Sequence, residues 1–318
     1  MLCPCCNSCD CENYAEIPLS VSGAGGIVRR SSTTLLCPAC LNAYKARCNG
    51  DACAVEEVCN SYCLHDVDDH VEQRVAYDRY SGGIRRSRYS LEFLLRQLSL
   101  GQHGRYLDVG CHFGSMIREF DEMFPRWEKV GFDISERFHN SVSGIGKNTS
   151  FVSGDISSLK GSFDLISIVN ALEQVDDPLK TLLDIKKRLK PGGYLFLQCC
   201  DLAENPYLPL IYEQNFNYSH FGLFSLLGCA GFDILTADKE WSPKDLHIIA
   251  TPGRGKAKTP EKKTAHSRLR EGADLLRGLL DSREVIAELG PQVGIFGTAY
   301  PSLWFANLVG NYASFFVD

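Results

Sequence analysis

The sequence contains no apolar run that approaches the ~20 residues a helix needs to cross a bilayer. It shows no basic amino-terminal stretch followed by an apolar core, so no secretory signal is expected. It also lacks excess positive charge, because the formal net charge is −6, and this disfavours nucleic acid or an anionic membrane as the partner. These absences predict a cytoplasmic protein with no membrane span and no nucleic-acid partner.

The composition is that of a globular chain. Of 318 residues, 44% are hydrophobic and 23% are charged, which is ordinary for folded soluble domains. At roughly 150 residues a domain, this length predicts about two domains.

Cysteine is concentrated at one end. Eleven of the fifteen cysteines lie between Cys3 and Cys63, in a stretch that shows little helical or strand periodicity. Without an export signal, metal is a better interpretation of this density than disulfides. Cys3 with Cys6, and Cys37 with Cys40, form two Cys-x-x-Cys pairs. Four thiolates hold one tetrahedral zinc with no open position, so the predicted zinc is structural.

Two alternatives to this metal site stay open at the sequence level. Cys5 competes with Cys6 for the assignment, and the cysteines could be free thiols in a disordered tail. Other cysteines and one histidine could hold a second metal, but their spacing follows no recognisable pattern. These residues are Cys9, Cys11, Cys48, Cys53, Cys59, Cys63 and His65.

Strand and helix patterns alternate from 104 to 251. Apolar segments bounded by Gly, Asp or Ser predict strands in "RYLDVG", "KVGFDIS", "TSFVSGDI", "FDLISIVN" and "GYLFLQCC". Helical patterns such as "SMIREFDEMF" and "PLKTLLDIKKRLK" lie between them. This alternation predicts an α/β fold with a mostly parallel sheet and helices on both faces.

The same reasoning divides the chain into five parts. The last part holds a long helix, a strand–loop–helix in "QVGIFGTAYPSLWFANLVG" and a strand in "ASFFVD", which together read as the start of a βαβ unit. The parts are a cysteine-rich module (1–66), a helical connector (67–103), the α/β domain (104–251), a linker (252–266) and a partial carboxy-terminal unit (267–318).

The loop in "YLDVGCHFGSM" indicates a ligand site. Gly110 allows a sharp turn after Asp108, and the helix that begins after Gly114 would direct its free N–H groups toward a ligand. A dinucleotide loop would carry a glycine where this chain has His112. The loop therefore suits a ligand without a diphosphate.

Polar side chains also end the next strands. Asp133, Asp155 and Asn170 follow the second, third and fourth predicted strands. In an open α/β sheet the carboxyl ends of the strands meet at one crevice, and an acid after the second strand can bind a ribose diol. We therefore expect these side chains to converge with Asp108.

At this point the sequence resembles a class I S-adenosylmethionine-dependent methyltransferase over about residues 104–251. The segments that carry the resemblance are "LDVGCHFG", "GFDIS", "GDI", "FDLISIVNALEQVDDP", "RLKPGGYLFL" and "LLGCAGFDIL". The resemblance implies S-adenosylmethionine as cofactor. Asp133 would bind its ribose hydroxyls, and Asp155 would lie near its adenine amine. Asp108, Gly110 and Asn170 would face its methionine end. The remaining cofactor-contact predictions are Cys111, Gly114, Ile134 and Ile156.

The two cysteine pairs and the carboxy-terminal glycine strand extend the resemblance to the sugar C-methyltransferases of deoxysugar biosynthesis. In that family a Tyr-His-Glu-His segment follows the fifth strand, and the chemistry implied is abstraction of a proton beside a ketone, followed by methyl transfer to the carbanion. Here the segment reads "IYEQNFNYSHFG". Glu213 keeps the glutamate, no histidine flanks it, and a register shift of one residue would place Tyr212 on the family tyrosine.

The catalytic candidates are therefore Glu213, Tyr212 and His220, the nearest histidine. A histidine base titrates near neutral pH unaided, whereas Glu213 would need burial to raise its pKa. The alternative is that these residues only cap a helix and fill the core.

The sequence thus predicts a methyltransferase acting on a sugar or nucleotide-sugar, at carbon or oxygen, in polysaccharide or natural-product biosynthesis. The alternatives are an O-methyltransferase of another small molecule and a cofactor-binding scaffold with weak catalysis. The carboxy-terminal unit is short for a core of its own. It could dock on the methyltransferase, form an oligomer with another chain, or be a remnant.

Overall fold

The computed structural model describes residues 2–8, 10–23, 25–46, 74–75, 83–242, 244–255, 260–290, 293–297 and 299–317. The metal-ligand predictions that lie outside the described residues are Cys9, Cys48, Cys53, Cys59, Cys63 and His65.

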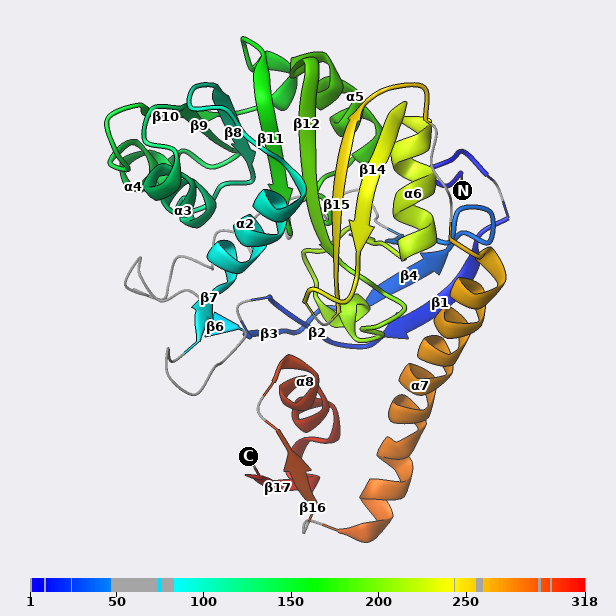
Figure 1. Cartoon of the computed structure of the whole chain (residues 1–318). Helices are drawn as coiled ribbons and strands as arrows, with labels where there is room; N and C mark the ends of the chain where they lie inside the picture. The colour runs from blue at the N-terminus through cyan, green and yellow to red at the C-terminus, as the bar shows by residue number, and fades with distance from the viewer. Residues whose placement is uncertain are drawn as a thin grey trace. The chain divides into compact units, whose positions relative to one another are not determined.

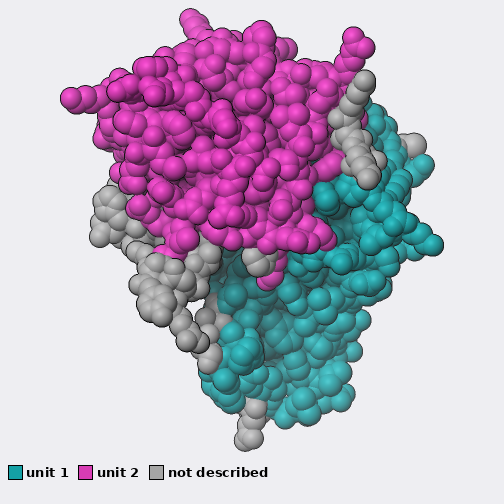
Figure 2. Space-filling view, in the orientation of Figure 1, with its two compact units in different colours: residues 1–65, 200–223, 260–318 teal, residues 66–199, 224–259 magenta. Residues whose placement is uncertain are grey.

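The chain forms two compact units, coloured separately in Figure 2. Unit 1 contains residues 1–65, 200–223 and 260–318, and unit 2 contains residues 66–199 and 224–259. The linear division predicted from the sequence is therefore not how the chain packs, because three distant segments build unit 1.

Unit 2 holds a seven-stranded sheet (Figure 1). Its strands are β8 (Arg105–Val109), β9 (Glu128–Asp133), β10 (Thr149–Ser153), β11 (Phe163–Val169), β12 (Leu189–Cys200), β14 (Phe232–Asp238) and β15 (Asp245–Pro252). They follow the order β10-β9-β8-β11-β12-β15-β14. Neighbours from β10 to β12 pair in parallel, and β14 pairs antiparallel with β15.

Helices connect these strands. They are α2 (Arg86–Gln97), α3 (Ser115–Met123), α4 (His139–Ser143), α5 (Pro178–Arg188) and α6 (His220–Cys229), with 3-10 turns η1 (Glu136–Phe138) and η2 (Ile156–Ser158). The first residues of α6, 220–223, belong to unit 1. A short ladder of β6 (Arg74–Val75) and β7 (Ile84–Arg85) precedes them. The start of α5 shows why the sequence begins a helix there. The Asp177 carboxylate accepts from the Lys180 N–H at 2.8 Å, and Pro178 occupies the first turn.

Both faces of this sheet are buried. On one face, side chains of α2 and α3 form a core with Tyr106, Leu165 and Phe196 of the sheet. Side chains alternate across a strand, and the intervening Leu107 and Ile166 are also fully buried. Parallel sheets are stable when covered in this way. The predicted α/β fold with a mostly parallel sheet, which is Rossmann-like, is therefore confirmed for this part of the chain.

Unit 1 is built on a four-stranded antiparallel sheet, in the order β1-β4-β5-β13. Its strands are β1 (Glu12–Ile17), β4 (Ser32–Leu36), β5 (Ala43–Lys45) and β13 (Phe216–Asn217), with a hairpin of β2 (Ser20–Val21) and β3 (Ile27–Val28) and a 3-10 turn η3 (Leu208–Leu210). The cysteine-rich module thus forms short strands although its sequence shows little strand periodicity. The strands are short, and β5 pairs with β13, which follows β12 of the other unit in the chain.

The carboxy-terminal elements pack into this same unit. They are α7 (Lys262–Leu289), β16 (Val293–Phe296), α8 (Tyr300–Val309), the 3-10 turn η4 (Gly310–Tyr312) and β17 (Ala313–Val317). Strands β16 and β17 pair in parallel, as a βαβ unit requires. Buried Trp304 of α8 donates its indole N–H to the Leu19 carbonyl at 2.7 Å. In α7, a Cβ on Gly272 would lie 2.8 Å from the Tyr14 hydroxyl, so glycine permits the close approach of β1.

These segments share one hydrophobic core with the cysteine-rich module. The carboxy-terminal unit therefore docks within unit 1. The predicted oligomer contact through it stays a prediction, as do the cytoplasmic location and the absence of a nucleic-acid partner. Among the helices of the described ranges, none is long and apolar enough to cross a bilayer.

His247 of β15 gives a prediction about stability. Its side chain is fully buried, its ring lies 5.1 Å from that of Phe93, and neither ring nitrogen has a hydrogen-bond partner among the described residues. Burial lowers its pKa to about 4. The folded pKa is thus below the unfolded value, so stability is lost as pH falls from about 6.5 toward 4.

We expect wild-type protein to lose about 2 kcal/mol between pH 7 and 5 through this group, and His247→Phe to lack that loss. Urea unfolding at both pH values measures it, with exposed His103→Phe as control. An unchanged pH dependence in His247→Phe would show that the imidazole is not buried in its neutral form.

Candidate cofactor crevice and metal cluster

The polar residues predicted from the sequence lie at the carboxyl edge of the unit 2 sheet. Asp108 is the fourth residue of β8, Asp133 ends β9, Asp155 follows β10 and Asn170 follows β11. Because these strands are parallel neighbours, their ends share one edge. The structure therefore brings the predicted set to the same side of the sheet.

The glycine loop after β8 depends on the absence of a side chain. Gly110 has φ +71°, and a Cβ there would lie 2.4 Å from the Cβ of Ala171. Its N–H donates to the Phe132 carbonyl at 2.8 Å, as does that of Cys111 at 3.1 Å. Gly114, at φ +81°, similarly packs against Ile145. Both glycines are therefore fixed by positive φ and close contact.

The His112 N–H is already engaged by the protein. It donates to the Asp133 carboxylate at 3.1 Å, and the Ser135 N–H donates to the other oxygen of Asp133 at 3.1 Å. The His112 backbone has φ +49°, and the centroid of its ring lies 4.3 Å from that of Phe138. This loop N–H thus orients a carboxylate, in agreement with a ligand that has no diphosphate.

Asp108 is buried behind the loop. Its carboxylate accepts from the Ser167 hydroxyl at 2.5 Å, and that hydroxyl lies 2.7 Å from the hydroxyl of Tyr106. Burial raises the pKa of Asp108 to about 7, with a contribution from the charge of Asp133, while the Ser167 hydrogen bond opposes the rise. Burial also raises the pKa of Asp133. The sequence analysis missed Ser167, although a serine within the apolar strand "FDLISIVN" was a visible signal.

Asp155 and Ile134 follow the neighbouring strands β10 and β9. The Asp155 carboxylate is exposed and accepts from the Ser157 N–H at 2.7 Å, and hydrogen bonds from the Ser157 side chain and from this N–H lower its pKa. Ile134 is 85% exposed although it is a large apolar side chain. An exposed apolar face between carboxylates suits a heteroaromatic base that also carries hydrogen-bond donors.

Asn170 carries an unmatched polar atom. Its backbone has φ +51°, and its N–H donates to the Gln198 carbonyl at 2.9 Å. Its side-chain oxygen is buried, with no hydrogen-bond partner among the described residues. Buried acceptors normally have a donor, so this oxygen fits the ammonium or hydroxyl of a bound ligand. The crevice residues therefore fit S-adenosylmethionine, whose amino acid and ribose supply such donors.

The metal prediction has a counterpart in unit 1. The thiols of Cys3, Cys6, Cys37 and Cys40 all lie within 4.8 Å of one another. The Cys3–Cys40 and Cys6–Cys37 sulfur distances are 3.7 and 3.6 Å. Sulfurs about 2.3 Å from a tetrahedral zinc would be about 3.8 Å apart. The four residues therefore fit zinc, and buried Cys5 is not one of the cluster.

Each Cys-x-x-Cys pair, Cys3 with Cys6 and Cys37 with Cys40, forms a tight turn that we call a knuckle, and the two knuckles have the same backbone geometry. The Asn7 N–H donates to the Cys3 carbonyl at 2.8 Å, and the Leu41 N–H donates to the Cys37 carbonyl at 2.7 Å. Asn7 and Leu41, each directly after the second cysteine of its pair, have φ +59° and +57°. This left-handed residue turns the chain so that both thiols of a pair face one point.

The predicted catalytic residues lie in unit 1, whereas the cofactor residues lie in unit 2. Tyr212 and Glu213 are buried, and the Glu213 carboxylate accepts from the Gly23 N–H at 2.6 Å. His220 is the first residue of α6 and is partly exposed. Buried Lys45 donates to the Tyr212 carbonyl at 3.1 Å. No motif in the sequence signalled Lys45.

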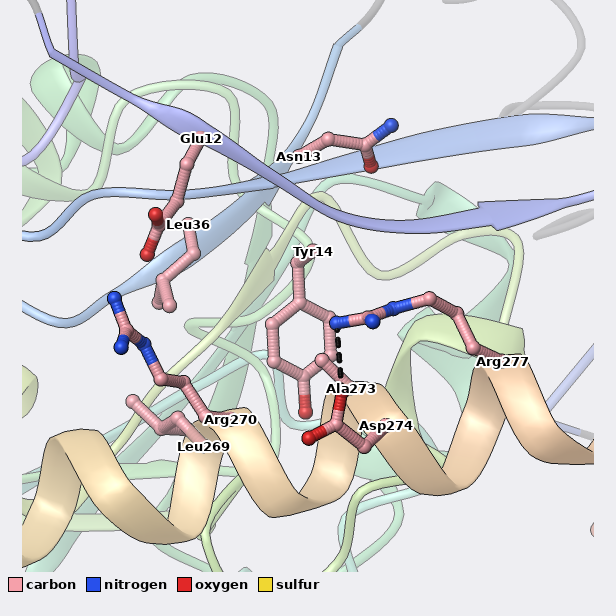
Figure 3. A pocket seen from close by; sticks show the side chains of 9 residues that line it. All are labelled: Glu12, Asn13, Tyr14, Leu36, Leu269, Arg270, Ala273, Asp274 and Arg277. Atoms are coloured by element: carbon pink, nitrogen blue, oxygen red, sulfur yellow. Dashed lines mark ion pairs between the residues drawn. The ribbon is translucent and has the colours of Figure 1, made fainter.

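A separate cavity of about 280 Å³ lies in unit 1 between β1, β4 and α7 (Figure 3). The ring of Tyr14 faces it, and Arg277 of α7 pairs there with Asp274 at 2.9 Å. No predicted site residue lines this cavity.

Comparison with known proteins adds to this geometry. Residues 83–237 match a family model described as a methyltransferase domain. The chain is 30% identical over 125 residues to an uncharacterized methyltransferase of Schizosaccharomyces pombe, covering 35% of this chain and 45% of that protein. It is 31% identical over 97 residues to trans-aconitate 2-methyltransferase of Deinococcus radiodurans, covering 30% and 38%. The chain thus spans about half the length, or less, of these curated relatives.

Among solved structures, a chain in the complex between the Haloferax volcanii Trm112 methyltransferase activator and the putative methyltransferase superposes with a TM-score of 0.46 at 16% identity. The match covers 53% of this chain and 91% of that one. Residues 83–237 are therefore similar to a methyltransferase domain, and the sheet of unit 2 is a mostly parallel, Rossmann-like α/β sheet.

Proposed function

We propose that this protein binds S-adenosylmethionine in the unit 2 crevice and transfers its methyl group to a small molecule, a sugar or nucleotide-sugar. The observation that supports the cofactor proposal is the buried Asn170 oxygen, which has no hydrogen-bond partner within the described ranges, at the same sheet edge as Asp133 and the exposed Ile134. The proposed pathway is the biosynthesis of a polysaccharide or natural product.

Support for a sugar comes from the combination of modules. The four-cysteine cluster and the carboxy-terminal βαβ unit accompany the methyltransferase domain here, and this combination resembles the sugar C-methyltransferases. The named relatives include enzymes of trans-aconitate and demethylmenaquinone, which are small molecules. The bound cofactor would supply an electrophilic methyl group on a sulfonium.

The crevice residues would divide the binding tasks. Asp133 would accept from the ribose hydroxyls, because the His112 and Ser135 N–H groups hold its carboxylate in place. Asp155 would accept from the adenine amine, and Ile134 with Ile156 would contact the base. Asp108 and Asn170 would face the methionine ammonium, with Cys111 and Gly114 completing the loop. Zinc, held by Cys3, Cys6, Cys37 and Cys40, would be structural.

In unit 1, Glu213, Tyr212 and His220 are the proposed substrate-side residues. For methylation at carbon, Glu213 would take the substrate proton. Its side chain is fully buried, and its carboxylate already accepts a hydrogen bond from the Gly23 N–H. This hydrogen bond favours methylation at oxygen as a second candidate, because such a transfer depends mainly on placing the nucleophile in line with the methyl group.

We expect the affinity for the cofactor to depend on pH because of Asp108. Its pKa of about 7 means that the carboxylate is mostly protonated at pH 6 and mostly ionised at pH 7.5. The ionised form attracts the cofactor ammonium, so affinity should rise roughly eightfold over this interval. Calorimetric titration at each pH measures it, and Asp108→Asn should give a flat profile. A wild-type affinity that falls with rising pH would contradict the assignment.

The test of the proposed function is transfer of a labelled methyl group. Zinc-replete protein with labelled S-adenosylmethionine is offered nucleotide-sugars with a ketone, nucleotide-sugars with hydroxyls only, and free phenols. Labelled product from the ketosugars, with the label on carbon, supports C-methylation, and label on oxygen supports the second candidate. Transfer to phenols alone would overturn the sugar assignment.

A further inference from the structure

The zinc knuckle of Cys37 and Cys40 is hydrogen-bonded to the segment that holds the proposed substrate-side residues. The Cys37 N–H donates to the Asn42 carbonyl at 3.0 Å, which ties Asn42 into the knuckle. All of these residues belong to unit 1.

The Asn42 side chain makes the first link. It is fully buried, and its amide donates to the Gly222 carbonyl at 3.0 Å. A Cβ at Gly222 would lie 1.8 Å from the Asn42 side-chain oxygen and 2.9 Å from the Cys40 carbonyl oxygen. Any side chain at 222 would therefore push α6 away from the knuckle, so glycine is required for this contact.

Ser219 makes the second link. Its buried hydroxyl donates to the Leu41 carbonyl at 2.7 Å and accepts from the Gly222 N–H at 3.0 Å. The second bond is that of a helix N-cap. One hydroxyl thus joins the residue after Cys40 to the first turn of α6, which begins at His220.

The strand that follows the knuckle extends the contact. In the β5–β13 pair, Ala43 faces Asn217 and Tyr44 faces Phe216. The Lys45 N–H donates to the Asn215 carbonyl at 2.9 Å, and its ammonium donates to the Tyr212 carbonyl at 3.1 Å. Hydrogen bonds and strand pairing therefore join residues 41–45 to the segment 212–222 at several points.

We propose that Asn42 and Ser219 are positioning residues that couple metal binding to the conformation of segment 212–222. The metal fixes the knuckle, and the knuckle fixes the segment that carries Tyr212, Glu213 and His220. Where this concerns methyl transfer, the inference rests on the proposed function. Binding of S-adenosylmethionine, which would use the crevice of the other unit, is not coupled in this way.

Coupling is reciprocal, because a contact that favours the metal-bound arrangement also strengthens metal binding. Loss of the Ser219 or Asn42 link should therefore weaken zinc binding, although neither residue is a ligand. A side chain with only a packing role would not change metal affinity in this selective way.

The experiment compares Ser219→Ala, Ser219→Thr and Asn42→Ala with Asn13→Ala, an exposed residue of β1 in the same unit. Zinc affinity is measured by competition with a chromophoric chelator. Hydrogen exchange of the backbone amides of residues 212–222 is measured by mass spectrometry, and cofactor affinity is measured by calorimetry. We expect Ser219→Ala and Asn42→Ala to lower zinc affinity about tenfold and to speed amide exchange in the zinc-loaded protein. Cofactor affinity should stay unchanged, and Ser219→Thr, which keeps the hydroxyl, should resemble wild type.

Zinc affinity and amide exchange equal to those of Asn13→Ala would overturn the coupling. Loss of cofactor affinity together with zinc would overturn it as well, since that pattern indicates general unfolding. Absence of methyl transfer by the wild-type protein would count against the proposed function but not against the coupling, because neither zinc affinity nor amide exchange depends on activity.

Discussion

Cys6→Ser is expected to release zinc and unfold the cysteine-rich sheet of unit 1. Structural zinc contributes about 10 kcal/mol or more of binding free energy at neutral pH, which is comparable with the whole stability of a domain. Cys37 and Cys40 lie in the turn between β4 (Ser32–Leu36) and β5 (Ala43–Lys45), so release of zinc removes the support of that turn. Bound metal and amide exchange over residues 12–45 measure the effect.

Cys5→Ser is the matched control, because Cys5 is adjacent and buried but is not one of the clustered thiols. It should retain one zinc and slow exchange in β1 and β4. Retention of zinc by Cys6→Ser together with its loss in Cys5→Ser would contradict the ligand set and restore the alternative pairing.

Gly110→Ala is expected to destabilise unit 2 by about 2–5 kcal/mol and to weaken cofactor binding. About 1–2 kcal/mol comes from the positive φ of +71°. A further ~1–3 kcal/mol is typical of forcing an extra methyl group into a packed site, here 2.4 Å from the Cβ of Ala171. Urea unfolding measures the change.

Gly192→Ala separates the two causes. Gly192 has a similar φ of +77°, and a Cβ there would meet nothing within 4 Å. Gly192→Ala should therefore lower the stability only through the strained positive φ, without the steric contact that Gly110→Ala adds. Equal destabilisation by the two substitutions would mean that the approach of the glycine loop to Ala171 is not as close as the structure has it.

The α/β part of this fold could be predicted from sequence because its signals are local. Each central strand is an apolar run that ends at Gly, Asp or Asn, and α5 has its own capping residue and proline. The acids at the ends of β8, β9 and β10 follow from strand order alone. The common position of these acids at one sheet edge was therefore predictable, whereas the hydrogen bond from Ser167 to Asp108 across strands was not.

Unit 1 could not be predicted in the same way because its contacts are distant in sequence. β5 pairs with β13, Tyr14 packs against Gly272, and Trp304 bonds to Leu19. None of these pairs leaves a periodic pattern in a local window. The four cysteines were predictable because metal-ligand spacing is local within each knuckle, but the link from Asn42 to Gly222 was not.

The most direct test of the cofactor crevice is calorimetric titration of S-adenosylmethionine into zinc-replete protein, with Asp133→Ala and the exposed-acid control Asp274→Ala alongside. Hydrogen bonds to a charged group contribute about 1.5–3 kcal/mol, so Asp133→Ala should raise the Kd at least tenfold while Asp274→Ala matches the wild type. No binding by folded wild-type protein, or equal binding by Asp133→Ala, would contradict the assignment of this sheet edge as the cofactor site.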